Sequence, residues 1–191
     1  LVFVDALDAA EIIRLNTISF PVVLMHQSPP PNLDIPVVCI ENREGTGQIV
    51  EHLITVHNRK RIAFLRGPEN NEDSKTREEG YLNALKKYNL PIDPNLISRG
   101  GFETESAYLA TKQMLSNGVV FDAVFSGDDD SAVGVMDALK QAGLDVPADV
   151  SVVGFDDSIF ARLVTPRLTT VRAPIEQVGR EAASQLIHLI R

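Results

Sequence analysis

The chain has 191 residues, which is enough for one well-packed core or two small lobes. Its formal net charge is −8, and its basic cluster at Arg59–Arg61 follows a predicted helix, so we do not expect the chain itself to bind DNA. No apolar run reaches the roughly 18 residues of a membrane helix, no secretory signal is visible, and the single cysteine, Cys39, excludes an internal disulfide. We therefore expect a cytoplasmic protein. Because the chain starts inside an apolar strand, we also expect it to be a fragment.

Short strands and amphipathic helices alternate along nearly the whole chain. The strand candidates are rich in valine and isoleucine, as expected for strands that are buried on both faces of a sheet. Apolar residues recur at helical spacing between them, and a last helix follows Pro174. This alternation predicts an α/β fold with parallel sheets. The predicted strands are Val2–Val4, Val22–Met25, Val37–Ile40, Ile62–Leu65, Leu96–Ser98, Ala123–Ser126, Val150–Phe155 and Leu168–Val171.

The segment from Phe121 to Pro174 is the most informative part of the chain. Two of its apolar strands, Ala123–Ser126 and Val150–Phe155, each run directly into a cluster of aspartates. The helix between them closes at Gly143, which makes a βαβ unit. Ligands of open parallel sheets bind at the carboxyl ends of the strands, so these aspartates are candidate ligand-binding residues.

Six stretches of the chain, some of them within this segment, occur in an order and spacing that resemble the effector-binding domain of the LacI/GalR family of transcriptional repressors. The resemblance covers the chain from about Asp34 to Ile190. The six stretches read RIAFLRG, TREEGYLNAL, GGFETESAY, DAVFSGDDDSAVGVMDALKQAG, VPADVSVVGFDDSIFA and PRLTTVRAPIEQVG.

The resemblance implies two doubly wound parallel-sheet lobes of the periplasmic-binding-protein-like type, with a small ligand in the cleft between them. The N-terminal lobe is expected to be incomplete, formed by residues 1–60 and 167–191, with the C-terminal lobe at 61–166. The last strand and helix, Leu168–Ile190, are expected to return mainly to the N-terminal lobe. The resemblance also implies a homodimer. Operator DNA would be bound only through a helix-turn-helix domain that is absent from this chain.

Arg77 and Asp156 are the main candidates for ligand contact. An arginine near a helix start is most often solvated, but the family's arginine in this R-x-x-G-Y context points into the cleft, where its planar fork suits hydroxyls or a carboxylate. Asp156 follows Val150–Phe155, and the family's first aspartate in GFDD accepts hydrogen bonds from sugar hydroxyls. A helix N-cap is the structural alternative for Asp156, with Asp157 the better candidate for that cap. Both Arg77 and Asp156 belong at wet positions, so neither is expected to matter much for folding.

Four weaker candidates complete the predicted site. Asp128 stands where the family has a ligand-contacting asparagine. An asparagine donates and accepts hydrogen bonds, whereas an ionised aspartate only accepts them. The ligands of family members are therefore a weaker guide to the ligand of this chain. Asp129 is the expected cap of the following helix. Phe102 could stack on a sugar or belong to the core. Glu44 and Asp5 match cleft-edge positions, where a solvated acid fits equally well.

The function that these features favour is a non-enzymatic sensor of a sugar or polyol whose binding controls DNA binding. A sensor fused to a kinase or cyclase and a periplasmic sugar-binding protein share the fold and remain alternatives. A third alternative is a phosphotransfer enzyme that holds Mg²⁺ between the aspartate clusters.

No cofactor is expected, because Gly45-Thr46-Gly47 lacks the third glycine of a dinucleotide fingerprint. No metal is expected at the histidines, which are scattered; His52 and His57, five apart, do not share a helix face well.

Overall fold

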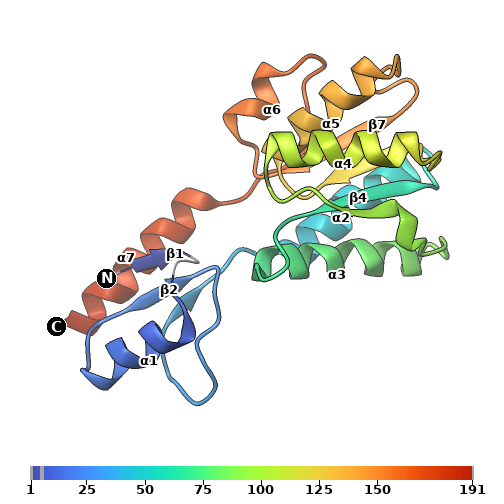
Figure 1. The fold of residues 1–191 in the computed structure, drawn as a ribbon. Helices are drawn as coiled ribbons and strands as arrows, with labels where there is room; N and C mark the ends of the chain where they lie inside the picture. Colours follow the sequence, from blue (N-terminus) through green and yellow to red (C-terminus); the bar gives the residue numbers. More distant parts are fainter. Residues whose placement is uncertain (1, 5–6, 191) are drawn as a thin grey trace. The chain divides into compact units, whose positions relative to one another are not determined.

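The computed structural model describes residues 2–4 and 7–190 and divides the chain into two compact units (Figure 1). The smaller unit contains residues 1–41, 71–73 and 174–191, and the larger unit contains residues 42–70 and 74–173.

The smaller unit is a three-stranded parallel sheet with a helix on each face. The strands β1 (Val2–Val4), β2 (Val23–Met25) and β3 (Val37–Val38) lie in the order β1-β2-β3. Successive side chains of a strand point to opposite faces. Leu24 therefore packs with Ile12 of α1 (Ala9–Thr17), whereas Val23 and Met25 pack with Val178 and Ala182 of α7 (Ile175–Ile190).

The larger unit is a five-stranded parallel sheet in the order β5-β4-β6-β7-β8. Its elements in chain order are α2 (Asn42–Thr55), β4 (Ile62–Arg66), α3 (Glu72–Lys87), the 3₁₀ turn Pro94–Leu96, β5 (Ile97–Arg99), α4 (Thr104–Ser116), β6 (Ala123–Ser126), α5 (Asp129–Gln141), β7 (Ser151–Phe155), α6 (Ile159–Leu163) and β8 (Thr169–Val171).

Helices cover both faces of this sheet, as the doubly wound prediction requires. On one face, Leu65 and Val124 pack with residues of α4 and α5, among them Val135. On the other face, the Phe64 ring stacks on Tyr81 of α3, with the ring centroids 5.1 Å apart. The chain runs from β4 to one side through β5 and then returns to the other side through β6, so the sheet has its topological switch point between β4 and β6.

The predicted fold class is confirmed, with one strand assigned differently. β8 pairs with β7 through Val153↔Thr169 and Gly154↔Thr170, which contradicts the expectation that it returns to the N-terminal lobe with the final helix. α2 packs against β7 and β8 and therefore also belongs to the larger unit. The predicted division of the chain into an N-terminal lobe, residues 1–60 with 167–191, and a C-terminal lobe, residues 61–166, stays a prediction.

Candidate functional site

The candidate site lies at the carboxyl edge of the five-stranded sheet, where β4, β6 and β7 end. Arg77, on α3, is its centre and is only 4% exposed. Its Nε donates to Asn42 Oδ1 at 2.9 Å, one terminal nitrogen donates to the Gly127 carbonyl at 2.6 Å, and the other faces Asp156 Oδ1 at 3.3 Å. The guanidinium also lies over the Phe155 ring, 3.8 Å from its centroid. The expectation that Arg77 lies at a wet position is therefore wrong, and because this one group joins α2, α3 and two strand ends, we expect it to matter for folding.

Asp156 presents a partly exposed carboxylate at the end of β7. Its side chain is 33% exposed, while its backbone N–H donates to the Val171 carbonyl at 2.8 Å. Its φ is 111° and that of Asp157 is 53°. Residues with side chains rarely adopt positive φ, and such positions gather at functional sites. Asp156 is thus held in an unusual conformation beside Arg77, and its contact with a ligand stays a prediction.

Phe102 lies against the strand ends at the switch point. A Cβ at Gly67 would overlap its ring, and one at Gly127 would come within 2.9 Å of it. The ring is half-buried, its centroid is 5.4 Å from the Arg77 guanidinium carbon, and Phe102 itself has φ 60°. The two glycines therefore leave the space that the ring occupies, and Phe102 joins the group around Arg77.

Asp128 caps α5, in contrast to the prediction that Asp129 does so. Its Oδ1 accepts from the Ser131 N–H at 3.0 Å, and its side chain is buried. Burial raises the pKa of Asp128, while the bond from Ser131 and the charge of Arg77 oppose that rise. Contact between Asp128 and a ligand stays a prediction.

Asp129 has a different role, which sequence reasoning missed. Its Oδ2 accepts from the Ser158 N–H at 2.7 Å and its Oδ1 accepts from Thr170 Oγ1 at 2.6 Å, so it connects α5 with the turn after β7 and with β8. Burial raises the pKa of Asp129, and these hydrogen bonds counteract the rise. The two donors follow Asp129 by 29 and 41 residues, so no local pattern indicates them.

The prediction that Asp157 caps α6 is wrong, because the N-cap of this helix is Ser158. The Asp157 carboxylate instead accepts from Arg172 Nε at 2.6 Å and from Arg162 at 3.3 Å. The bond from Arg172 is the main cause that lowers the pKa of Asp157.

Glu44 and Asp5 are the last two residues of the predicted site. Glu44 is exposed on the first turn of α2, where it accepts from Gln48 Nε2 at 3.1 Å, and its contact with a ligand stays a prediction. Asp5 lies outside the described residues.

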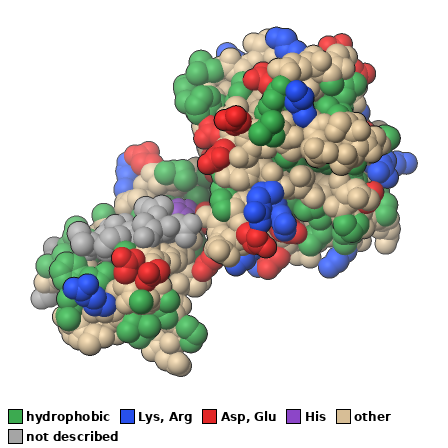
Figure 2. Space-filling view, in the orientation of Figure 1, with side chains coloured by type: hydrophobic (Ala, Val, Ile, Leu, Met, Phe, Trp, Pro, Cys, Tyr) green, Lys and Arg blue, Asp and Glu red, His purple; other side chains and the backbone are tan. Residues whose placement is uncertain are grey.

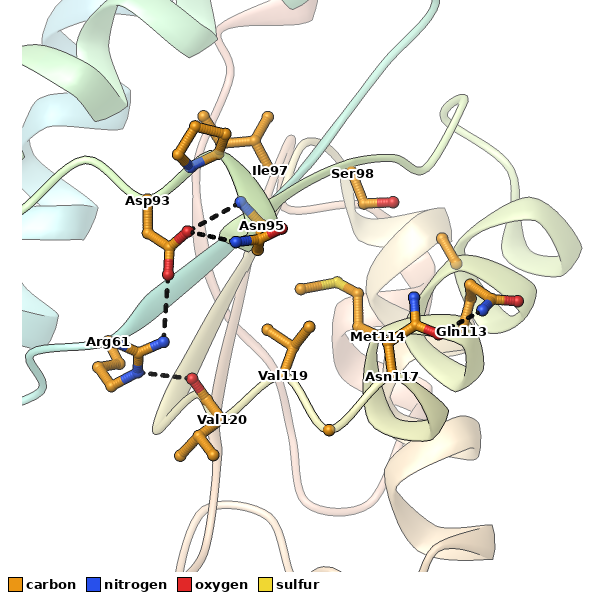
Figure 3. Close-up of a pocket in the computed structure, with 13 residues that line it drawn as sticks. Arg61, Asp93, Asn95, Ile97, Ser98, Gln113, Met114, Asn117, Val119 and Val120 are labelled. Carbon is orange, nitrogen blue, oxygen red and sulfur yellow. Dashed lines mark hydrogen bonds and ion pairs between the residues drawn. The ribbon is translucent and has the colours of Figure 1, made fainter.

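A cavity of about 660 Å³ occupies the opposite, amino-terminal edge of the same sheet (Figure 3). Arg61 lies on one side of it, bonded to Asp93 and to the Val120 carbonyl, and Met114 of α4 also lines it. Its lining contains no residue of the predicted site.

The histidines show one contact that their spacing did not predict. Nε2 of His52 and Nε2 of His57 lie 3.2 Å apart, because α2 ends at Thr55 and the following turn brings His57 back. Across the described residues, no three or more His, Cys, Asp or Glu side chains group together as metal ligands would. None of the helices in residues 2–4 and 7–190 has the length and apolar character needed to cross a membrane.

Comparisons with known proteins agree with this architecture. A family model described as a periplasmic binding protein-like domain matches residues 50–191. The probable HTH-type transcriptional repressor ExuR of Bacillus subtilis (strain 168) is 34% identical over 184 residues, which are 96% of this chain and 55% of the relative. The chain thus spans about half the length of that curated relative.

Solved structures give the same result. A regulatory protein of the LacI family from Chloroflexus aggregans has a TM-score of 0.89 and 30% identity, with 99% of this chain and 68% of that one covered. The complex of the transcriptional regulator CelR with cellobiose has a TM-score of 0.87 and 30% identity, with 97% and 57% covered. The chain therefore belongs to the LacI family of transcriptional regulators, in which it corresponds to the periplasmic-binding-protein-like effector domain.

Proposed function

We propose that the chain senses a neutral sugar or polyol at the carboxyl edge of the five-stranded sheet, and that binding changes the affinity of the complete repressor for operator DNA. The observation that carries the proposal is the Asp156 carboxylate, partly exposed, held at positive φ and paired with a buried arginine.

The arrangement of charges favours hydroxyl groups over a ligand carboxylate. Each of the three guanidinium nitrogens of Arg77 already faces a protein oxygen, from Asn42, Gly127 or Asp156. Asp156 and Asp128 add acceptors to the same edge. An ionised carboxylate accepts hydrogen bonds from hydroxyls, whereas it repels an anionic ligand.

Phe102 adds an apolar surface to these polar groups. Its half-buried ring lies beside Arg77, and the apolar face of a sugar ring can stack on an aromatic ring. A ligand with vicinal hydroxyls and an apolar face would use both features together. The related CelR structure contains cellobiose, a neutral sugar, which supports this ligand class.

A homodimer is part of the proposal. Ile49 and Leu53 of α2 are buried in the core of the larger unit, so they cannot form the contact with a second copy. Among the exposed apolar residues of the larger unit are Ile159 and Leu163 of α6, which are 60% and 69% exposed, and Figure 2 shows hydrophobic side chains gathered over this helix. We assign α6 to the surface that contacts a second copy of the protein.

The relatives reported above are transcriptional regulators rather than enzymes. They favour this proposal over a sensor fused to a kinase or cyclase, a periplasmic sugar-binding protein and a phosphotransfer enzyme. The proposal implies a cytoplasmic protein, because a repressor acts on chromosomal DNA.

Calorimetric titration of the complete protein tests the ligand class. The ligands are cellobiose, D-ribose, D-glucose and D-galactose, with D-glucuronate and D-galacturonate as anionic counterparts. We expect a neutral sugar to bind, and Asp156→Asn to weaken its binding by one to two orders of magnitude, because a hydrogen bond to a charged group is worth about 1.5–3 kcal/mol. Asp137→Asn, an exposed acid on α5, is the control and should bind like the parent. Preference for the uronates, or parent-like binding by Asp156→Asn, would refute the proposal.

A further inference from the structure

The turn that presents Asp156 has a conformation that the chain does not favour by itself. Asp156 and the next residue, Asp157, both have positive φ, at 111° and 53°. This region is unfavourable for residues with a Cβ, and it persists only where surrounding contacts determine it. Some part of the larger unit must therefore hold the turn.

The buried carboxylate of Asp129 contacts this turn directly and through one intermediate. Its Oδ2 accepts from the Ser158 N–H at 2.7 Å, and its Oδ1 accepts from Thr170 Oγ1 at 2.6 Å. Thr170 Oγ1 in turn accepts from the Asp157 N–H at 3.4 Å. The two backbone N–H groups that follow Asp156 are thus both connected to Asp129.

The structure around this carboxylate is built to accommodate it. Gly154 lies on β7 next to Asp129, and a Cβ at Gly154 would overlap Asp129 Oδ1. Asp129 is also in the first turn of α5, where the helix dipole favours a negative charge. Its side chain is 1% exposed, so its hydrogen bonds are shielded from water.

The charged contacts of the Asp157 side chain are weaker. Asp157 bonds to Arg172 and Arg162, whose side chains are 81% and 61% exposed. Ion pairs with such exposed partners contribute little, because water screens them and ordering the long side chains costs entropy. The buried bonds of Asp129 therefore hold the two backbone N–H groups after Asp156 more firmly than these surface pairs do.

We propose that Asp129 is a positioning residue: through Ser158 and Thr170 it holds the turn in the conformation that places the Asp156 carboxylate for ligand binding. This inference rests on the proposed function, in which Asp156 accepts hydrogen bonds from the ligand. Asp129 itself acts only through the turn.

Three substitutions in the complete protein test the role. Asp129→Asn replaces one carboxylate oxygen by an NH₂ group, which cannot accept a hydrogen bond from Ser158 or Thr170. Thr170→Val removes the relaying hydroxyl at nearly unchanged shape, and Thr170→Ser is the matched control because it keeps the hydroxyl. If Asp129→Asn does not fold, the Thr170 pair decides the question alone.

The first measurement needs no ligand. We expect hydrogen exchange of the backbone amides in the peptide spanning residues 156–163 to become at least tenfold faster in Asp129→Asn and Thr170→Val, and to stay at the parent rate in Thr170→Ser. Exchange at the parent rate in the first two variants would overturn the proposal, whether or not any tested sugar binds.

The second measurement separates positioning from general stability. We take whichever of cellobiose, D-ribose, D-glucose and D-galactose binds the parent most tightly, and expect about tenfold weaker binding in Asp129→Asn and Thr170→Val, with recovery in Thr170→Ser. Faster exchange with unchanged affinity would also overturn the proposal. If Asp156→Asn keeps the parent affinity, the proposed function fails, and the exchange rates still decide whether Asp129 holds the turn.

Discussion

Arg77 joins three parts of the larger unit through one guanidinium group, so its partners depend on it. Replacement by alanine would leave the Gly127 carbonyl, Asn42 and Asp156 without their donor. Removing one member of a buried charged pair costs about 3–5 kcal/mol, and since Asp156 is partly exposed we expect a loss near the lower value, about 3 kcal/mol. The midpoint of urea unfolding at pH 7 measures this loss.

Arg180→Ala is the matched control for this substitution. Arg180 pairs with Glu176 on the exposed face of α7, where such a pair is worth at most about 0.5 kcal/mol. Arg77→Lys should be intermediate between the parent and Arg77→Ala, because lysine keeps the charge without the planar fork. Equal midpoints for Arg77→Ala and the parent would show that the guanidinium does not stabilise the unit.

The packing of α4 on α5 depends on the absence of a side chain at Gly134. A Cβ there would overlap the Thr104 carbonyl oxygen and come within 2.9 Å of the Tyr108 backbone nitrogen, and neither backbone group can rotate away. We expect Gly134→Ala to lower the free energy of unfolding by about 2 kcal/mol, within the usual cost of overpacking. Gly47→Ala is the control in α2, where nothing lies within 4 Å of the added methyl group. It should raise stability by about 0.5–1 kcal/mol, because alanine favours a helix interior.

Thermal and urea unfolding of the two glycine variants would be compared with the parent under the same conditions. The added methyl group is expected to lower the free energy of unfolding at position 134 and to raise it at position 47. A destabilising Gly47→Ala, or a neutral Gly134→Ala, would contradict the close approach of α4 and α5.

For the whole molecule, the proposed dimer depends on the exposed apolar residues of α6. We expect Leu163→Asp in the complete protein to weaken dimerisation at least tenfold, because a charge would replace an apolar side chain in the interface. Leu163 is 69% exposed in the single chain, so unfolding of the monomer should change little. Sedimentation velocity over a micromolar concentration range measures the effect.

The control for the dimer is Val120→Asp, which changes an equally exposed apolar residue, 68% exposed, at the opposite, amino-terminal edge of the sheet. It should dimerise like the parent. A dimer that tolerates Leu163→Asp, or that dissociates with Val120→Asp, would place the contact elsewhere.

Local features of the sequence were sufficient for much of the fold and for the location of the site. The strand Ala123–Ser126 has the predicted bounds, because a short apolar run buried on both faces needs no distant information. The aspartates that follow β6 and β7 lie at one edge of the sheet because parallel neighbouring strands end together. Arg77 was found through its motif context, and its position beside Asp156 agrees with that prediction.

By itself, the sequence determined the α/β class, the order of the elements, the family and the group of candidate residues, since all of these follow from local periodicity or from motif order. The tertiary structure alone decided which aspartate caps α5, which one supports the turn, and which sheet receives β8. It also decided that Arg77 is buried. The physical reason is that these roles depend on partners that are distant in sequence: Asp156 is 79 residues from Arg77. Neighbouring aspartates such as Asp128 and Asp129 also point in different directions, so a shift of one residue along the chain changes which donor a carboxylate meets.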